Sequence, residues 1–409
     1  MHRTGMVSGR DYVVGCISFL VVFCIVWLIW YVLMHPDGVM KLYTPMYGFS
    51  LAVVFLAVVV LMSQVLDVTA ASNESAPGRA GIGYGMVLTA VAVVLTLVVV
   101  YGVFWGFIGR LGVAYFSPQS IVASGGTGAE PFVARENAST AIIYFSAAFL
   151  WWALTWKAGF GSWPWAGVGR GVLAWSRFAS IMVFTVITYV VLFHPHVCYL
   201  FYPPQNKAGV DPWWASFAGT GSAFFSLGLI LCTLAWVVIT DLCWEGYPWK
   251  ALEKHGEKSF LTGLSTLIGT FVLGLMTFVV LLKIMTYYWM EPFEGGQYTD
   301  APYFRYLHAG EFAGFLMLAS FILKDYFGNF PQVSGLFARG LLRTGIVFLG
   351  AILIRWFYYS PASTFVLGKV PGIAQPDDTP LVWTILFLSI IMVHRDFLGN
   401  WPMRATTEQ

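Results

Sequence analysis

The chain has 409 residues, of which 58% are hydrophobic and 10% are charged, and its formal net charge is +2. Soluble domains carry about 25% charged residues, so this composition excludes an ordinary soluble protein and indicates a polytopic membrane protein. The small net charge provides no strong field for nucleic acid, and we expect no nucleic-acid partner. The lipid bilayer is the expected surrounding.

Ten runs almost free of charge are long enough to form membrane spans of about 20 residues. They cover 12–34, 46–66, 83–109, 137–156, 178–198, 214–240, 260–287, 303–323, 342–361 and 379–394. If the N-terminus is cytoplasmic, 14 of the 22 Lys and Arg residues fall on inner segments, so both termini are predicted to face the cytoplasm. We therefore predict one all-α integral membrane domain over 1–409, in a bacterial inner membrane.

Two kinds of segment recur along the chain. VLMHPDGVMKLYTP (Val32–Pro45) and VLFHPHVCYLFYPP (Val191–Pro204) share His-Pro, Tyr and a final Pro. Four predicted inner ends read GFGSWPW, WEGYPW, DYFGNFP and DFLGNWP, in which Gly is expected to end the helix and Pro to prevent its continuation. The repetition predicts five consecutive helical hairpins, each running outward and then inward, over 12–66, 83–156, 178–240, 260–323 and 342–394. The alternative is that aromatic belts and proline caps recur in any membrane protein.

Two predicted spans contain ionisable residues that they cannot avoid. Only twelve uncharged residues separate Glu311 from Lys324, fewer than the roughly 20 that a span needs. This helix therefore crosses the membrane only if Glu311 and His308 enter with it. The next helix has the same problem, because eleven uncharged residues separate Arg343 from Arg355. Ionisable groups inside a membrane are candidate functional residues by default.

We predict that three of these residues form a catalytic group. Glu311 and Arg355 fall at similar depths, so we predict that the guanidinium pairs with the carboxylate and keeps it charged. His308 is the candidate proton acceptor, because its unperturbed pKa lies near neutrality. The alternative is that Arg355 extends to the headgroups and that His308 is a satisfied interface histidine. Four residues are predicted to line the same outer pocket and bind a ligand: Lys283, Arg305, Tyr287 and Tyr288.

The second His-Pro segment has two interpretations, a metal site and a helix end. His194, His196 and Cys198 are three potential ligands, and His35 would be a fourth if the repeats pack by pseudo-symmetry. A helix end at His-Pro is the stronger interpretation of this segment. The five cysteines include no CxxC, and no span carries a pair of axial histidines, so we expect no haem or metal cluster within the chain.

Three functions fit these features. The first is a membrane subunit of a redox or respiratory complex, with an outward-facing quinol pocket lined by His308, Glu311 and Arg355, and with partner subunits that carry the electrons. Its motivation includes 18 Trp, 20 Tyr and 34 Phe residues. The second is a secondary transporter of protons or a small anion, and the third is a structural subunit of a membrane assembly. Whether the chain is an enzyme, and its substrate, partners and direction of flux, are left open.

Overall fold

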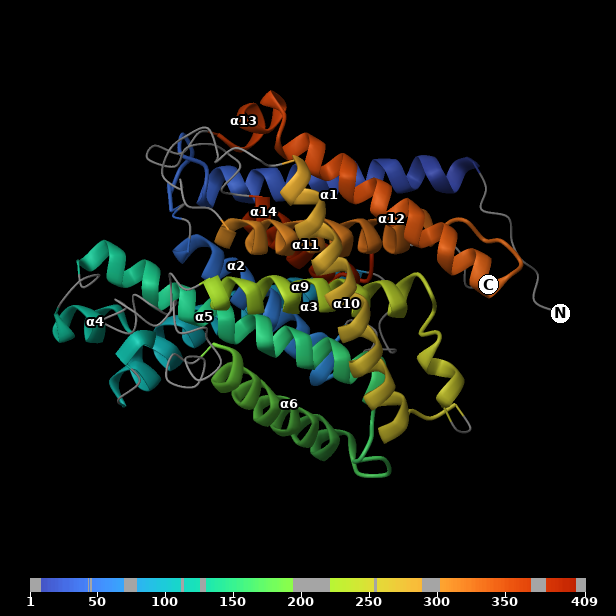
Figure 1. Ribbon diagram of the computed structural model, residues 1–409, viewed down its shortest axis with the longest axis horizontal. Helices are drawn as coiled ribbons and strands as arrows, with labels where there is room; N and C mark the ends of the chain where they lie inside the picture. The colour runs from blue at the N-terminus through green and yellow to red at the C-terminus, as the bar shows by residue number, and fades with distance from the viewer. Residues whose placement is uncertain are drawn as a thin grey trace.

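The computed structural model describes residues 9–42, 44, 46–69, 79–111, 114–125, 130–193, 221–253, 256–288, 302–368 and 380–401. These residues form helices joined by turns, and no β-strand occurs among them (Figure 1). The α-helices are α1 (Gly9–Leu33), α2 (Tyr47–Val60), α3 (Arg79–Leu97), α4 (Pro118–Ser124), α5 (Pro131–Thr155), α6 (Arg170–Leu192), α9 (Gly221–Leu242), α10 (Phe260–Tyr288), α11 (Pro302–Phe327), α12 (Leu336–Tyr358), α13 (Pro361–Leu367) and α14 (Pro380–Met392).

Nine helices of the described part are long and apolar enough to cross a membrane, so the chain is an integral membrane protein. They correspond to the first nine expected spans. The tenth, expected over 379–394, is α14, which has 13 residues and continues as a π-helical turn over Val393–Phe397. Its crossing of the membrane stays a prediction, because it is not among the nine candidate spans and 369–379 lie outside the described residues.

Burial divides the spans into two groups. The most apolar windows of α2, α5, α9 and α11 are 72–89% buried inside the protein, whereas those of α1, α3, α6, α10 and α12 are 22–28% buried. The described side chains of α14 are almost all buried, so α14 belongs with the first group. We call α2, α5, α9, α11 and α14 the inner ring, and the other five spans the outer helices.

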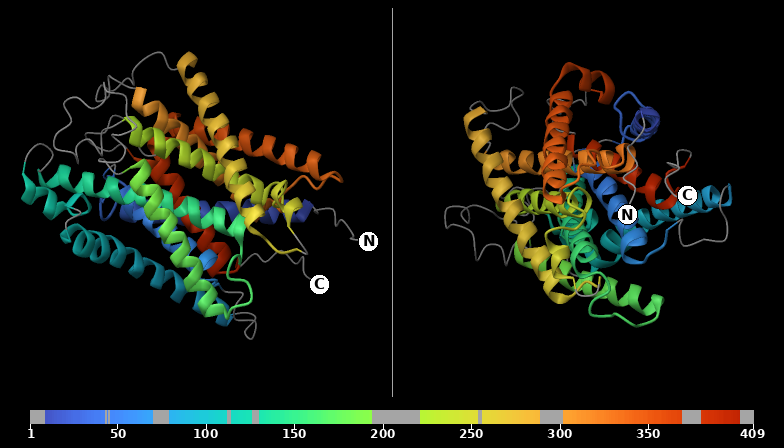
Figure 2. Two further views of the ribbon diagram at one scale, coloured as in Figure 1. Left: turned by 60° about the horizontal axis from the view of Figure 1, so that its bottom comes forward. Right: turned by 90° about the vertical axis from the view of Figure 1, so that its right-hand side faces the viewer.

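The inner ring closes on itself. Each inner helix packs against the inner helix that follows it in the chain, and the last one, α14, packs against the first, α2. In Figure 1, α9 and α11 occupy the middle of the molecule, and α6 and α12 lie on opposite sides of it, as they also do in the right-hand view of Figure 2.

Each outer helix covers a junction between two inner helices. For example, α6 packs on α5 and on the end of α2, α10 packs on α9 and on the end of α5, and α1 packs on α11 and α14. The resulting architecture is five inner helices sheathed by five outer ones.

The consecutive helices that pack together are not the pairs that the predicted hairpins would join. The closest contacts between consecutive spans join α2 to α3, α5 to α6, α9 to α10 and α11 to α12. Each of these pairs joins the second helix of one predicted hairpin to the first helix of the next. The predicted hairpins were 12–66, 83–156, 178–240, 260–323 and 342–394. The turn 328–335, between α11 and α12, is one of the connections that join such a pair. An origin of the chain in repeated hairpins stays a prediction.

All five inner helices end in the same way. A residue in the left-handed conformation, with φ between 55° and 60°, stops each helix: Asp67, Gly161, Glu245, Gly328 and Gly399. Glycine favours this conformation, and the sequence signal predicted a glycine at each of four ends. The prediction is wrong for WEGYPW, where Glu245 stops the helix and Gly246 follows it.

Cationic side chains from neighbouring elements cap three of these ends, those of α2, α5 and α9. Arg177 of α6 donates to the carbonyl oxygen of Val65 at 3.1 Å, at the end of α2. Lys258, just before α10, donates to the carbonyl oxygen of Lys157 at 2.6 Å, in the last turn of the span that contains α5. A positive group at a helix C-terminus satisfies free carbonyl oxygens and opposes the negative end of the helix dipole.

Candidate functional site

Three cavities follow one another along the axis of the inner ring. We name them the Glu311 cavity, the apolar cavity and the Arg395 cavity after residues or chemistry of their linings. The first two share Phe49, Ile143 and Leu227, and the last two share Leu154, Val238, Phe321 and Met392. Because these shared residues are ordered along the helices, the cavities form a line from the N-terminal halves of the inner helices to their C-terminal ends.

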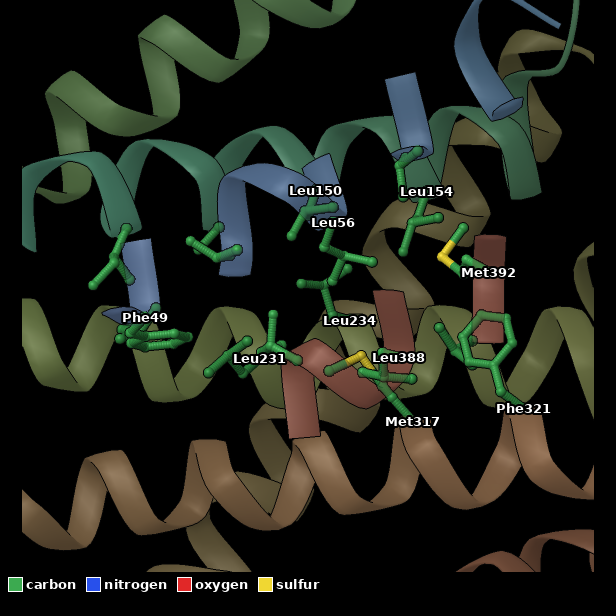
Figure 3. Close-up of a pocket in the computed structure, with 17 residues that line it drawn as sticks. Phe49, Leu56, Leu150, Leu154, Leu231, Leu234, Met317, Phe321, Leu388 and Met392 are labelled. Carbon is green, nitrogen blue, oxygen red and sulfur yellow. The ribbon is translucent and has the colours of Figure 1, made fainter. Parts of the chain in front are cut away.

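The apolar cavity has a volume of about 30 Å³ and is lined by 17 residues, all of them hydrophobic (Figure 3). All five inner helices contribute, and the labelled side chains point toward one another from opposite sides. The residues seven positions before each left-handed helix stop form one level of this lining: Val60, Leu154, Val238, Phe321 and Met392. A second level lies one turn earlier: Leu56, Leu150, Leu234, Met317 and Leu388. The cavity is therefore an apolar passage built from equivalent positions.

The Glu311 cavity has a volume of about 40 Å³, enough for a few water molecules. Its polar lining consists of Glu311 from α11 and of Thr140 and Tyr144 from α5. The inner helices α2, α9 and α14 contribute only apolar side chains to it. Glu311 is thus the one ionisable carboxylate of this lining, and it faces the axis rather than lipid.

His308 and Glu311 form a buried hydrogen-bonded pair on α11. His308 Nδ1 lies 2.6 Å from Glu311 Oε2, and the two residues are 8% and 4% exposed. Positions three apart on a helix are neighbours on its surface, which explains the contact. The hydroxyl of Tyr359 lies 3.4 Å from His308 Nδ1 and 3.5 Å from Glu311 Oε2. An imidazole and a carboxylate in this arrangement can share a proton and pass it to a bound group.

Close packing of α9 and α11 fixes the position of this pair. A Cβ on Gly228 of α9 would lie 2.3 Å from the carbonyl oxygen of Tyr306, so only glycine permits this approach. Gly310 meets the same surface, because its Cβ would lie 3.4 Å from the Cα of Gly228. The turn of α11 that contains His308 is therefore pressed against α9 and turned into the protein.

Arg355 reaches this cluster through an aromatic ring. Its guanidinium carbon lies 4.7 Å from the centroid of the Tyr359 ring, while the hydroxyl of Tyr359 contacts Glu311. The contact that the structure gives Glu311 is the hydrogen bond with His308. The predicted pair between Glu311 and Arg355 stays a prediction.

The remaining predicted ligand residues have varied placements. Lys283 is exposed on α10. Tyr287 and Tyr288 belong to α10 and Arg305 to α11, but their side chains lie outside the described part.

His194, His196 and Cys198 of the predicted metal site lie outside the described residues altogether. His35 is buried, and its Nδ1 accepts a hydrogen bond from the backbone N–H of Asp37 at 3.0 Å. Within the described part, no group of three His, Cys, Asp or Glu side chains could hold a metal ion.

The Arg395 cavity, of about 20 Å³, lies at the other end of the line. Its polar lining comprises Gln64, Lys157, Asp241 and Arg395, one from each of four inner helices or their extensions. Phe321 separates it from the apolar cavity, and the guanidinium of Arg395 lies over the Phe321 ring at 5.0 Å. A charged cluster therefore begins directly where the apolar lining ends.

Ion pairs hold this cluster together. Arg395 Nε lies 2.7 Å from Asp396 Oδ1, and Gln64 donates to the other oxygen of Asp396 at 2.7 Å. A second carboxylate, Asp325, lies 3.7 Å from Arg395 Nη1.

Lys157 Nζ and Asp241 Oδ2 are 3.9 Å apart. This longer pair bridges α9 and the π-helical extension of α5, both of which line the cavity.

This cluster is not among the residues predicted from the sequence, although a signal for it is present there. Lys157, Asp241, Lys324 and Arg395 each lie seven residues before the proline of a repeated inner-end segment. In the structure these positions come four residues before the left-handed stop of each helix, and Ser63 is the fifth member. Aligning the four segments would have revealed an ionisable residue at one position of every repeat.

The chain matches no protein-family model, no curated protein and no solved structure. Its function is therefore inferred from the three cavities and from the side chains that line them.

Proposed function

We propose that this protein transports a small solute across the membrane along the axis of the inner ring, with Glu311 exchanging a proton during the cycle. The observation that carries the proposal is the line of three cavities enclosed by five helices. Ionisable residues that face the interior of a membrane bundle commonly mark ion or substrate pathways. Here a carboxylate lies at one end of the line and a charged cluster at the other.

The orientation follows from the distribution of Lys and Arg. With both termini in the cytoplasm, the inner helices run inward and the Arg395 cavity opens toward the cytoplasm. The Glu311 cavity then faces the opposite side of the membrane. A solute entering from outside would meet Glu311 first and the Arg395 cluster last.

The described conformation is closed in its middle third. The apolar lining offers no polar partner, and hydrophobic constrictions close pathways by excluding water. Phe321 and Met392 line both the apolar cavity and the Arg395 cavity, so a movement of these two side chains would join the two. We assign them the role of the inner gate.

A quinol site in a subunit of a redox complex is the second candidate. The hydrogen-bonded pair of His308 and Glu311 favours it, because such a pair can accept a proton from a hydroxyl group. The Glu311 cavity has room for a few water molecules and is too small for a quinol ring in this conformation, so transport fits the cavity better. A structural subunit would require neither the cavities nor the pair.

Flux through purified protein in liposomes tests transport against both alternatives. We expect wild-type protein to carry protons or one of a panel of small anions and weak acids faster than protein-free liposomes. Glu311→Gln should slow that flux at least tenfold, while Glu257→Gln, at an exposed glutamate outside the ring, should not change it. Flux that is absent for the whole panel, or unchanged in Glu311→Gln, would reject the proposal. Two results together would support the redox alternative instead: partners with haem or iron–sulfur centres co-purify, and the assembly with Glu311→Gln loses quinol turnover.

A further inference from the structure

Extending the transport proposal, on which this step rests, we propose that the solute crosses the apolar cavity without charge. The solute class is a small weak acid: its anion is protonated at the Glu311 end, passes as the neutral acid, and loses the proton at the Arg395 end.

The apolar lining argues for an uncharged species. On α2 the lining runs from Phe49 to Val60, a rise of about 16 Å along the helix. None of the lining side chains can replace the water around an ion, and an unpaired charge in such a medium is strongly disfavoured. A neutral molecule of a few heavy atoms loses much less hydration. The apolar passage thus excludes charged solutes whatever their shape.

The pair of His308 and Glu311 is placed to supply the proton. It lies at the entrance to the apolar passage, and Glu311 itself lines the Glu311 cavity. The proton shared by Nδ1 and Oε2 would move to an oxygen of the anion, which leaves as the neutral acid. Water on the same side of the membrane would then return a proton to the pair, so that charge and protons balance.

Within the described residues, the other titratable groups placed near this pair are mainly tyrosines. Tyr144 of α5 lines the same cavity, and Tyr358 and Tyr359 approach from the end of α12. Arg355 contacts the Tyr359 ring and is the charged residue that α12 brings to this cluster. Because α2, α9 and α14 contribute apolar linings, proton exchange at this end centres on His308 and Glu311.

The Arg395 end suits the release of an anion. Two cations, Lys157 and Arg395, line the Arg395 cavity against one carboxylate, Asp241. The wider cluster keeps the same excess of one positive charge, with four cations against three carboxylates: Lys157, Lys258, Lys324 and Arg395 against Asp241, Asp325 and Asp396. An excess positive charge favours the ionised form of an acid, so the neutral acid would lose its proton there.

Liposomes that contain a pH-sensitive dye test this inference. We expect an inward gradient of formate or lactate to acidify the interior faster with wild-type protein than without it. The rate should rise as the outside pH falls and should not respond to a clamped membrane potential, because one anion and one proton cross together. Nitrate, which stays ionised at these pH values, should not cross. Glu311→Gln should reduce the weak-acid rate at least tenfold.

A polar substitution in the passage provides a matched second test. Leu234→Ser places a hydroxyl in the apolar cavity, whereas Leu353→Ser places one on the exposed surface of α12. We expect nitrate to leak through Leu234→Ser and not through Leu353→Ser, with both variants eluting as folded protein.

Different results separate the two proposals. Potential-driven nitrate flux through wild-type protein would overturn the uncharged passage and leave transport intact. Alkalinisation by methylammonium, without any effect of formate or lactate, would overturn the assignment to a weak acid. An absence of flux for every probe would reject the transport proposal itself.

Discussion

Arg343 of α12 donates from Nη1 to the carbonyl oxygen of Cys243, just beyond the end of α9, at 3.1 Å. The same nitrogen lies 2.8 Å from Glu245, and Nη2 donates to Gln332 at 2.9 Å, so the fully buried guanidinium has a partner on each side. Arg343 thus caps α9 as Arg177 caps α2. From the sequence, the charge of Arg343 was expected to disfavour the membrane span that contains it. In the structure it satisfies a carbonyl oxygen just beyond the end of the neighbouring helix α9.

Replacing Arg343 should therefore destabilise the fold strongly. Arg343→Met leaves the Cys243 carbonyl and Glu245 without their buried donor, and we expect a loss of about 3–5 kcal/mol. Arg339→Met removes a more exposed pair with Glu245 and should cost about 1 kcal/mol or less. Unfolding by denaturant in detergent measures both, and equal losses would argue against the capping role.

The contact between α9 and α11 predicts a sharp difference between two glycines. Gly228→Ala forces a Cβ against the Tyr306 carbonyl and should destabilise by about 1–3 kcal/mol. Gly345→Ala, on α12, meets no atom within 4 Å and should stabilise by up to about 1 kcal/mol. Melting temperatures of the two variants check the prediction, and a tolerated Gly228→Ala would show that α9 and α11 are farther apart than described.

Glu136 should contribute to the start of α2. Its Oε2 accepts from the backbone N–H groups of Met46 at 2.8 Å and Tyr47 at 3.3 Å. Glu136→Ala removes this cap and should cost about 1–2 kcal/mol. Glu130→Ala, at an exposed glutamate whose side chain makes no cap at the start of α5, is the control and should cost less than about 0.5 kcal/mol. Equal losses of stability for the two variants in thermal unfolding would show that Glu136 does not cap α2.

His35 should make stability fall in mild acid. Burial lowers the pKa of His35 below its ordinary 6.5, although nearby Asp37 partly opposes the shift. The unfolded chain then binds a proton at a higher pH than the folded one, so stability is complete above about pH 6.5 and declines as pH falls toward the lowered pKa.

Protonation of His35 Nδ1 would also remove the hydrogen bond from the Asp37 N–H. Melting temperatures at pH 7.5, 6.5 and 5.5 should decrease for wild-type protein more steeply than for His35→Asn. Parallel curves for the two proteins would contradict the prediction.

The sequence predicted which segments cross the membrane better than it predicted how they pack. Runs without charge identified nine helices, because lipid excludes charge whatever the neighbours are. The choice between inner and outer helices was not available from the same signal, since lipid and protein interior are equally apolar. Leu234 on α9 and Ile268 on α10 look alike in sequence, yet they are 2% and 54% exposed.

Part of the candidate site could be anticipated from span length. The helix that contains His308 and Glu311 was too short without them, and both side chains are buried inside the bundle. The hydrogen-bond partner of Glu311 was harder to predict. Matching depths favoured Arg355 on another helix, and that pair stays a prediction, whereas the contact that the structure gives joins Glu311 to His308, three residues away on the same helix. The position of Tyr359 after α12 depends on how the chain turns there, and no spacing rule indicates it.

One chain forms all five helices of the inner ring, so the side chains at equivalent positions of these helices can differ from one another. In a ring of five identical subunits every substitution would be repeated five times, and no level could hold a single acid. Here the position four residues before the helix stop holds Ser63, Lys157, Asp241, Lys324 and Arg395, so it differs around the circle. Charge at each level can consequently be adjusted in steps of one, and a lone carboxylate such as Glu311 need not repel four copies of itself.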